Sequence, residues 1–334
     1  MTPPGPTLFV FQDINQAYAE MQTVKDDLTE WEDTRNGRAQ AFQDPVLLHS
    51  PTPQRRVLFC PRRDANPFFH YMEAIWMLSG SENVDFPSRF ARQIAEYSDD
   101  GITLHGAYGY RWRRAFEIDQ IESIIHGLKR DPTSRRLVIS MWDPQLDLEV
   151  NSKDLPCNTQ LYFRVVQGYL NMTVLNRSND MVWGMLGANY VHMGILHEYI
   201  AEAAGLRQGS MFQFSNNLHV YEGWGGEDKY GPPSKWYEQN PTFNRWVFGP
   251  TNFDWEEAAD FVEYFKNDDG SDINDPPQWK CRILRDNAYP MLMAWTSHKA
   301  GNIDLALHYA AKIHDDDWKE ACSLWLKRRQ TKSK

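Results

Sequence analysis

The sequence predicts an α+β fold, because segments with helical periodicity lie on both sides of a stretch with strand periodicity. Apolar side chains spaced three to four residues apart predict helices at residues 67–79, 118–130 and 189–204. Alternating apolar side chains predict an antiparallel hairpin at residues 159–175, with its turn at Gln167-Gly168. These elements indicate helices packed on a β-sheet.

The composition indicates a folded chain. It has 334 residues, of which 42% are hydrophobic, with 13 Trp, 15 Tyr and 17 Phe. A disordered chain carries far fewer such residues. The length permits one large domain or two ordinary ones. The net charge of −10 argues against general nucleic-acid binding, although a local arginine cluster could still hold one phosphate.

The cysteines do not indicate disulfides or a metal site. Cys60, Cys157, Cys281 and Cys322 are widely separated, without a CxxC pair or a zinc-like His/Cys spacing. There is no leader-like N-terminus and no apolar run long enough to span a bilayer, so no membrane partner is expected. The expected location is the cytoplasm, or that of a host cell if the protein is phage-encoded.

The first helix is predicted over residues 12–32, from the spacing of apolar side chains. The next begins after Asn66, which can cap it, with Pro67 in the first helical position, and ends near Gly80. Its apolar stripe includes Glu73. A carboxylate on a buried face is either held by a structural hydrogen bond or ion pair, or it is a general acid or base tuned by burial.

Arg135 and Arg136 precede a buried strand predicted at residues 137–139. Adjacent side chains on a strand point to opposite faces, so both could reach one ligand only from a loop or a strand end. A solvated basic turn is the alternative.

Cys157 enters the predicted hairpin and Arg177 follows its exit, so the two should be neighbours. Ser178 and Asp180 come directly afterwards. A thiol beside a guanidinium, a hydroxyl and a carboxylate is suited to nucleophilic attack on an anionic substrate. An inert buried cysteine is the alternative.

Beyond residue 205 the periodicity of apolar side chains is less regular. Residues 212–221 are predicted to form one strand, with His219 and Tyr221 on the same face. Residues 223–277 are rich in loop-forming residues, with a helix expected at 255–265, and the tail from 289 to 329 has helical patterning in three segments.

Residues 66–221 resemble the thymidylate synthase superfamily, and in detail its nucleotide hydroxymethylase branch. The matching motifs, in order, are the helix around Glu73, Gly106-Ala107-Tyr108-Gly109-Tyr110-Arg111-Trp112, Ser134-Arg135-Arg136, Pro156-Cys157, Arg177-Ser178-x-Asp180 and His219-x-Tyr221. Asn189 also matches if one extra residue stands between Gly184 and Asn189. The resemblance implies a single thymidylate synthase-like catalytic domain over residues 1–334, with a loop-rich and helical C-terminal region at 223–334. It also implies a mixed β-sheet packed with helices, and sheets that meet back to back in a homodimer.

The resemblance implies that Cys157 adds to C6 of a pyrimidine nucleoside monophosphate, and that C5 then takes a one-carbon unit from 5,10-methylenetetrahydrofolate. Glu73 and Tyr108 would be the other catalytic residues. The implied substrate-binding residues are Arg177, Ser178 and Asn179, the phosphate arginines Arg135 and Arg136 of a second subunit, Asn189 at the base, and His219 and Tyr221 at the sugar. Asp180 and Gly184 would contact folate, and no metal is implied.

Three departures from the methylating enzymes favour water over hydride as the group that captures the methylene intermediate. Asn158 stands where those enzymes usually have histidine, Arg177-Ser178-Asn179-Asp180 has the hydroxymethylase form, and the C-terminus lacks a short apolar tail. Asn189 favours dUMP over dCMP or CMP, although a flipped amide could also pair with cytosine.

Three alternatives stay open at this point. One is a thymidylate synthase, which methylates dUMP reductively. Another is a catalytically silent relative that binds a nucleotide. The last is a cysteine hydrolase in which Cys157 pairs with a histidine, a role for which His192, His197 and His219 are candidates.

Overall fold

The chain divides into two units, each assembled from three separate stretches. Unit 1 comprises Met1–Ala65, Glu122–Trp142 and Cys157–Asn244, and unit 2 comprises Asn66–Ile121, Asp143–Pro156 and Arg245–Lys334. The computed structural model describes residues 5–21, 24, 28–223, 253–266 and 278–332. A single catalytic domain over residues 1–334 stays a prediction. Much of the loop-rich stretch predicted at 223–277 lies outside the described residues.

Unit 1 contains the strands. They are β1 (Thr7–Val10), β2 (Glu32–Thr34), β3 (Gly37–Ala41), β4 (Val46–Ser50), β5 (Val138–Ser140), β6 (Asn158–Val166), β7 (Tyr169–Asn176), β8 (Asn179–Asp180), β9 (Arg207–Ser215) and β10 (Leu218–Tyr221). Within the described residues they form a six-stranded sheet, β1-β4-β9-β7-β6-β5, and a four-stranded sheet, β2-β3-β10-β8. Each sheet mixes parallel and antiparallel neighbours. The predicted α+β class with a mixed sheet is therefore confirmed.

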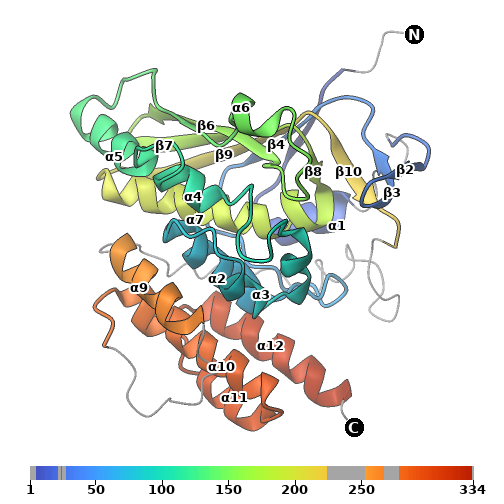
Figure 1. Cartoon of the computed structure of the whole chain (residues 1–334), viewed down its shortest axis with the longest axis vertical. Helices are drawn as coiled ribbons and strands as arrows, with labels where there is room; N and C mark the ends of the chain where they lie inside the picture. Colours follow the sequence, from blue (N-terminus) through green and yellow to red (C-terminus); the bar gives the residue numbers. More distant parts are fainter. Residues whose placement is uncertain (1–4, 22–23, 25–27, 224–252, 267–277, 333–334) are drawn as a thin grey trace. The chain divides into compact units, whose positions relative to one another are not determined.

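Helix α7 (Ala188–Ala203) contacts β7 and β9 and runs along the six-stranded sheet (Figure 1). It ends before Gly205, whose φ of +72° is the left-handed conformation that glycine adopts at helix ends. This agrees with the helix predicted at residues 189–204. In the described residues, the other helical segments with most of their residues in unit 1 are α1 (Ile14–Met21), α5 (Gln120–Arg130) and the π-helix η2 (Met181–Met185).

The predicted hairpin is confirmed as β6 and β7. Gln167 and Gly168 both have positive φ, +52° and +79°, as expected for a two-residue hairpin turn. Leu161 and Phe163 are buried on one face. At the open end of the hairpin Asn158 pairs with Asn176, so the residues just outside these positions meet.

Two sequence predictions were wrong in their extent. The helix predicted over residues 12–32 ends at Met21, and Glu32 begins β2, which pairs with β3. The strand predicted over 212–221 is two strands in different sheets. Asn216 N–H donates to Asn176 O and Asn217 O accepts from Asn179 N–H, and these bonds turn the chain from one sheet to the other.

Unit 2 is helical in its described residues. Its segments are α2 (Pro67–Leu78), α3 (Asp85–Ser88), η1 (Arg92–Tyr97), α4 (Tyr108–Arg113), α6 (Pro144–Asp147), α9 (Trp255–Lys266), η4 (Leu284–Ala288), α10 (Tyr289–Lys299), α11 (Ile303–Ala310) and α12 (Asp316–Lys332). The predicted start of α2 is confirmed, because Asn66 Oδ1 accepts from the backbone N–H groups of Phe68 and Phe69 at 3.1 and 3.2 Å. The helix expected at 255–265 and the three helical segments of the tail are also present.

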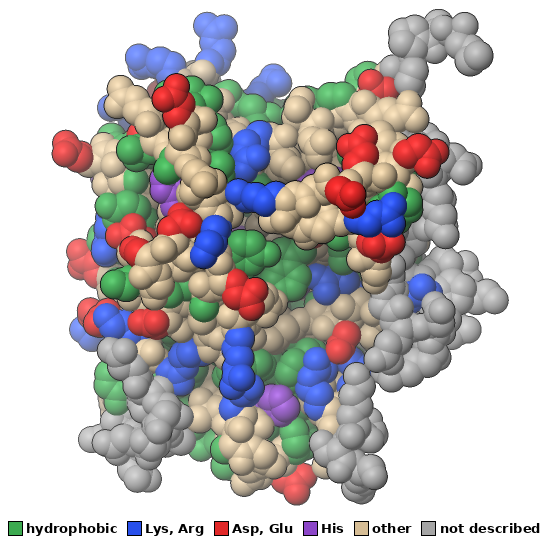
Figure 2. Space-filling model, turned by 45° about the vertical axis from the view of Figure 1, so that its right-hand side comes forward, with side chains coloured by type: hydrophobic (Ala, Val, Ile, Leu, Met, Phe, Trp, Pro, Cys, Tyr) green, Lys and Arg blue, Asp and Glu red, His purple; other side chains and the backbone are tan. Residues whose placement is uncertain are grey.

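The face drawn in Figure 2 carries acidic and basic side chains interspersed with apolar ones. No helix in the described part of the chain is both long and apolar enough to cross a membrane.

Candidate active site

Cys157 lies directly before β6, where the two ends of the hairpin meet. Arg177 N–H donates to Cys157 O at 3.0 Å, and Arg177 Nη2 lies 4.0 Å from Cys157 Sγ. A positive charge near a thiol stabilises the thiolate, which is the nucleophilic form. The predicted proximity of these two residues is confirmed.

Cys157 differs from the other three cysteines in its solvent exposure. Cys60, Cys281 and Cys322 are buried, whereas Cys157 is partly exposed, and all four lie in the described residues. Burial raises the pKa of the Cys281 and Cys322 thiols, which keeps them protonated. Cys157 is therefore the cysteine whose exposure and neighbours fit a nucleophile.

Arg177 is exposed but held in place. Its guanidinium lies over the indole of Trp142, 5.6 Å from the ring centroid, which is a cation–π contact. Trp142 was not among the predicted site residues. Thirty-five positions separate the two side chains in the chain, and no periodicity links them, so only the folded sheet reveals the contact.

The residues after Arg177 meet the predicted sugar-binding pair. Strands β8 and β10 are parallel neighbours, and His219 pairs with Asp180. Ser178 Oγ lies 3.4 Å from His219 Nδ1, and the rings of His219 and Tyr221 meet edge to face at 5.1 Å. Burial lowers the pKa of His219, although the Asp180 charge opposes the shift, so its imidazole is neutral at pH 7.

Asp180 also shapes the following turn. Its Oδ1 accepts from the N–H groups of Val182 and Trp183 at 2.8 and 3.0 Å, which caps η2. Arg63 donates to Val182 O, at 3.3 Å from Nε and 3.2 Å from Nη2, and its guanidinium lies 5.9 Å from the centroid of the Trp183 ring. Sequence reasoning missed Arg63. The dipeptide Arg62-Arg63 just before the capped helix was the available signal.

Gly184 lies between two amide side chains. A Cβ on Gly184 would come within 2.3 Å of Asn179 Oδ1 and 3.1 Å of Asn189 Nδ2, so a larger residue would displace them. Asn179 is buried and donates from Nδ2 to Ser215 Oγ at 3.2 Å. Gly184 belongs to η2, and π-helical turns are frequent at functional sites. The structure thus brings Asn179, Gly184 and Asn189 together.

Arg135 and Arg136 lie between α5 and β5, and both are exposed. Their position at the start of a strand is the one predicted. Their contact with a phosphate stays a prediction.

Glu73 lies in unit 2, on α2, and is 8% exposed. Burial raises its pKa to about 8, and the negative charge of Asp154 adds to this shift. A raised pKa is compatible with the acid–base role, which stays a prediction. A carboxyl group that titrates close to neutral pH is suited to both giving and taking a proton.

Tyr108 begins α4 in the same unit. Its ring stacks against Trp112, with centroids 6.4 Å apart. A Cβ on the next residue, Gly109, would lie only 2.0 Å from Met77 O, so α4 rests directly on α2. The helices that carry Tyr108 and Glu73 are therefore in contact.

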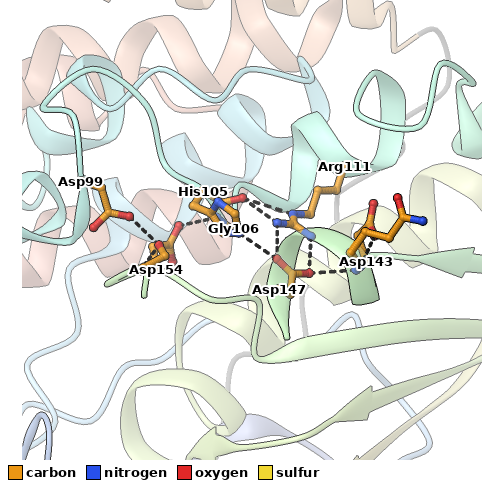
Figure 3. A network of polar contacts seen from close by, with 9 residues as sticks. Asp99, His105, Gly106, Arg111, Asp143, Asp147 and Asp154 are labelled. Carbon is orange, nitrogen blue, oxygen red and sulfur yellow. Dashed lines mark hydrogen bonds and ion pairs between the residues drawn. The ribbon is translucent and has the colours of Figure 1, made fainter. Parts of the chain in front are cut away.

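A polar network anchors the start of α4 (Figure 3). Asp147 of α6 accepts from Arg111 Nη1 and Nη2 at 2.7 and 2.8 Å, contacts His105 Nε2 at 2.8 Å, and accepts from Asp143 N–H at 2.8 Å. Burial raises the pKa of Asp147, but these bonds outweigh burial and the net pKa is below its usual value. Asp147 was missed because nothing local in its sequence links it to Arg111.

Comparison with known proteins gives consistent matches. A family model described as thymidylate synthase matches residues 65–229. The deoxyuridylate hydroxymethyltransferase of Pseudomonas phage M6 is 40% identical over 312 residues, which cover 89% of this chain and 87% of the relative. Proteins of the same name from Bacillus phage SP01 and Delftia phage PhiW-14 are 35% and 32% identical, over 53% and 58% of this chain and 49% and 56% of theirs. The chain therefore belongs to the thymidylate synthase family, in its hydroxymethylase branch, and is a one-carbon transferase.

Proposed function

We propose that the protein is a deoxyuridylate 5-hydroxymethylase. It transfers a one-carbon unit from 5,10-methylenetetrahydrofolate to C5 of dUMP, and water captures the methylene intermediate. The observation that carries this proposal is the pairing of the partly exposed Cys157 with Arg177 at the mouth of the hairpin, beside Ser178 and His219. The names of the relatives support uracil as the base.

The proposed reaction begins at Cys157. Its thiolate adds to C6 of the pyrimidine, which makes C5 nucleophilic enough to attack the one-carbon unit. Tetrahydrofolate leaves by elimination, water adds to the exocyclic methylene group, and the thiolate is then expelled from C6. We assign the proton transfers to Glu73, whose pKa of about 8 suits them, and a supporting catalytic role to Tyr108.

Binding roles follow the chemistry of each side chain. Arg177 and Ser178 bind the phosphate, because a guanidinium and a hydroxyl both donate to its oxygens. His219 and Tyr221 contact the sugar, and Asn189 reads the base, with Asn179 positioned beside it across Gly184. Asp180 and Gly184 are assigned to folate.

The proposed active form is a homodimer in which Arg135 and Arg136 bind the phosphate in the partner subunit. The outer face of the six-stranded sheet supports this form. Residues that alternate with the buried ones stay partly exposed there, and they include the stacked pair His49 and Phe212, with ring centroids 4.5 Å apart. On the same sheet Tyr162 and Tyr169 are 38% and 40% exposed. Such an aromatic face is suited to packing against a second copy.

The product identifies the reaction. Incubation with dUMP and 5,10-methylenetetrahydrofolate should yield 5-hydroxymethyl-dUMP and tetrahydrofolate, because water supplies the hydroxyl group and no hydride leaves the folate. Parallel reactions with dCMP, UMP and CMP report the base and the sugar. Thymidylate together with dihydrofolate would instead identify a methylating enzyme, and consumption of neither substrate would point to a silent relative.

Asn189→Asp should move the base preference towards cytosine. An amide can donate to O4 of uracil, whereas a carboxylate only accepts and suits the amino group of cytosine. We expect the ratio of kcat/KM for dCMP to that for dUMP to rise by about tenfold or more, since one buried hydrogen bond is broken and another made. Asn36→Asp, on the exposed β2–β3 turn, adds the same charge and should leave the ratio unchanged. An unaltered ratio in Asn189→Asp would remove Asn189 as the base reader.

A further inference from the structure

Asp154 is a partly buried carboxylate in unit 2, outside every role assigned so far. Its Oδ2 accepts from Gly106 N–H at 2.8 Å, two residues before Tyr108. A Cβ on Gly106 would lie 3.0 Å from Asp154 O and 3.1 Å from Asp154 Oδ2. The close approach of these two segments therefore depends on a glycine at position 106.

The segment that carries Asp154 is held on its other side as well. Asp154 N–H donates to Ser152 Oγ at 3.1 Å, and Ser152 Oγ donates in turn to Asp99 Oδ2 at 2.6 Å. Lys153 N–H also donates to Asp99, at 3.2 Å from Oδ1. Figure 3 shows Asp154 between Asp99 and the group formed by His105, Gly106 and Arg111. Its carboxylate thus has a defined position.

This position relates Asp154 to Glu73. Gly106 leads into α4, and α4 rests on α2 at Gly109 and Met77. Met77 follows Glu73 by four residues, so both lie on the same face of α2. The negative charge of Asp154 also acts on Glu73 and opposes its ionisation.

We propose that Asp154 is a positioning residue for the acid–base chemistry of Glu73. Its hydrogen bond to Gly106 holds the turn that leads into α4, and α4 packs on α2, the helix that carries Glu73. This inference rests on the role proposed above for Glu73.

The two carboxyl groups differ in what surrounds them. Burial raises the pKa of both. For Asp154, the hydrogen bond from Gly106 N–H and the charges of His105 and Arg111 act against this rise and favour the carboxylate. The negative charge of Asp99 adds to the rise. Glu73 responds to burial and to Asp154. An ionised Asp154 opposes ionisation of Glu73, so Glu73 keeps its proton to higher pH than burial alone would give.

Asp154→Asn tests the inference, because the amide oxygen can still accept from Gly106 N–H while the charge is lost. The ionisation of Glu73, followed by infrared titration of its protonated carboxyl band and identified by loss of that band in Glu73→Gln, should move to lower pH by roughly half to one unit. In the plot of kcat/KM against pH, the limb set by the ionisation of Glu73 should also move to lower pH by this amount. Asp154→Ala, which removes the hydrogen bond too, should show the same shift and in addition lower the Tm.

Asp99→Asn is the matched control. It changes an exposed carboxylate that holds the same segment, so it should leave the Glu73 band in place. An unshifted Glu73 ionisation in both Asp154 variants would overturn the inference. The infrared readout does not depend on turnover, so failure of the proposed reaction would appear separately, as missing product from the wild-type protein.

Discussion

We expect Cys157→Ala to abolish turnover of dUMP and to retain nucleotide binding. The variant has no sulfur to add to C6, so C5 is never activated, and we expect kcat to fall by roughly 10⁴-fold or more, as for other enzymes that lose a nucleophile. Binding survives because the contacts of Arg177 with Trp142 and with the backbone carbonyl of residue 157 do not use the sulfur. Product formation measures the first effect and isothermal titration calorimetry the second.

Cys60→Ala provides the control for this variant. Cys60 is a buried cysteine of the same unit, so its replacement should cost stability through a small cavity and leave kcat close to that of the wild type. Turnover in Cys157→Ala comparable to that in Cys60→Ala would exclude the nucleophile assignment. Loss of nucleotide binding in Cys157→Ala would show that the substitution disturbs the hairpin mouth itself.

Glu73→Gln should abolish turnover. It should also make the free energy of unfolding fall less as the pH rises. The pKa of Glu73 is about 8 in the folded chain, above its ordinary value of 4.5. Below the ordinary value both states hold the proton and nothing is lost. As pH rises from there towards 8, the unfolded chain releases the proton and the folded chain does not, so stability falls. At pH 7 this loss amounts to about 3 kcal/mol, and glutamine does not incur it.

Urea unfolding of both proteins at pH 5, 6, 7 and 8 measures this effect. The free energy of unfolding of Glu73→Gln minus that of the wild type should grow by about 1.4 kcal/mol per pH unit until it levels off near pH 8. Glu149→Gln, at an exposed glutamate, should give a difference that does not change with pH. A flat difference for Glu73→Gln as well would mean that Glu73 is ionised in the folded protein at neutral pH.

The sequence by itself determined those features whose causes lie within a few residues. Asn66 and Pro67 predict where α2 begins, because a capping side chain and a proline act on the adjacent turn. Gln167-Gly168 predicts the hairpin turn, and pairing of the strands then requires Cys157 and Arg177 to meet. Family resemblance added the remaining candidate residues, and the structure brings Ser178 close to His219 and Asn179 close to Asn189.

Tertiary structure decided whatever depends on residues far apart in the chain. The break at Asn216 and Asn217 arises from backbone hydrogen bonds to β7 and β8, and the assignment of the two strands to different sheets follows only from these long-range bonds. The contact of Trp142 with Arg177 and the bond of Asp154 to Gly106 join positions that no local pattern relates. The raised pKa of Glu73 likewise comes from burial and from a charge 81 positions away. Periodicity reports only which face of an element is apolar, whereas distances, burial and charge at a site exist only once the elements are packed.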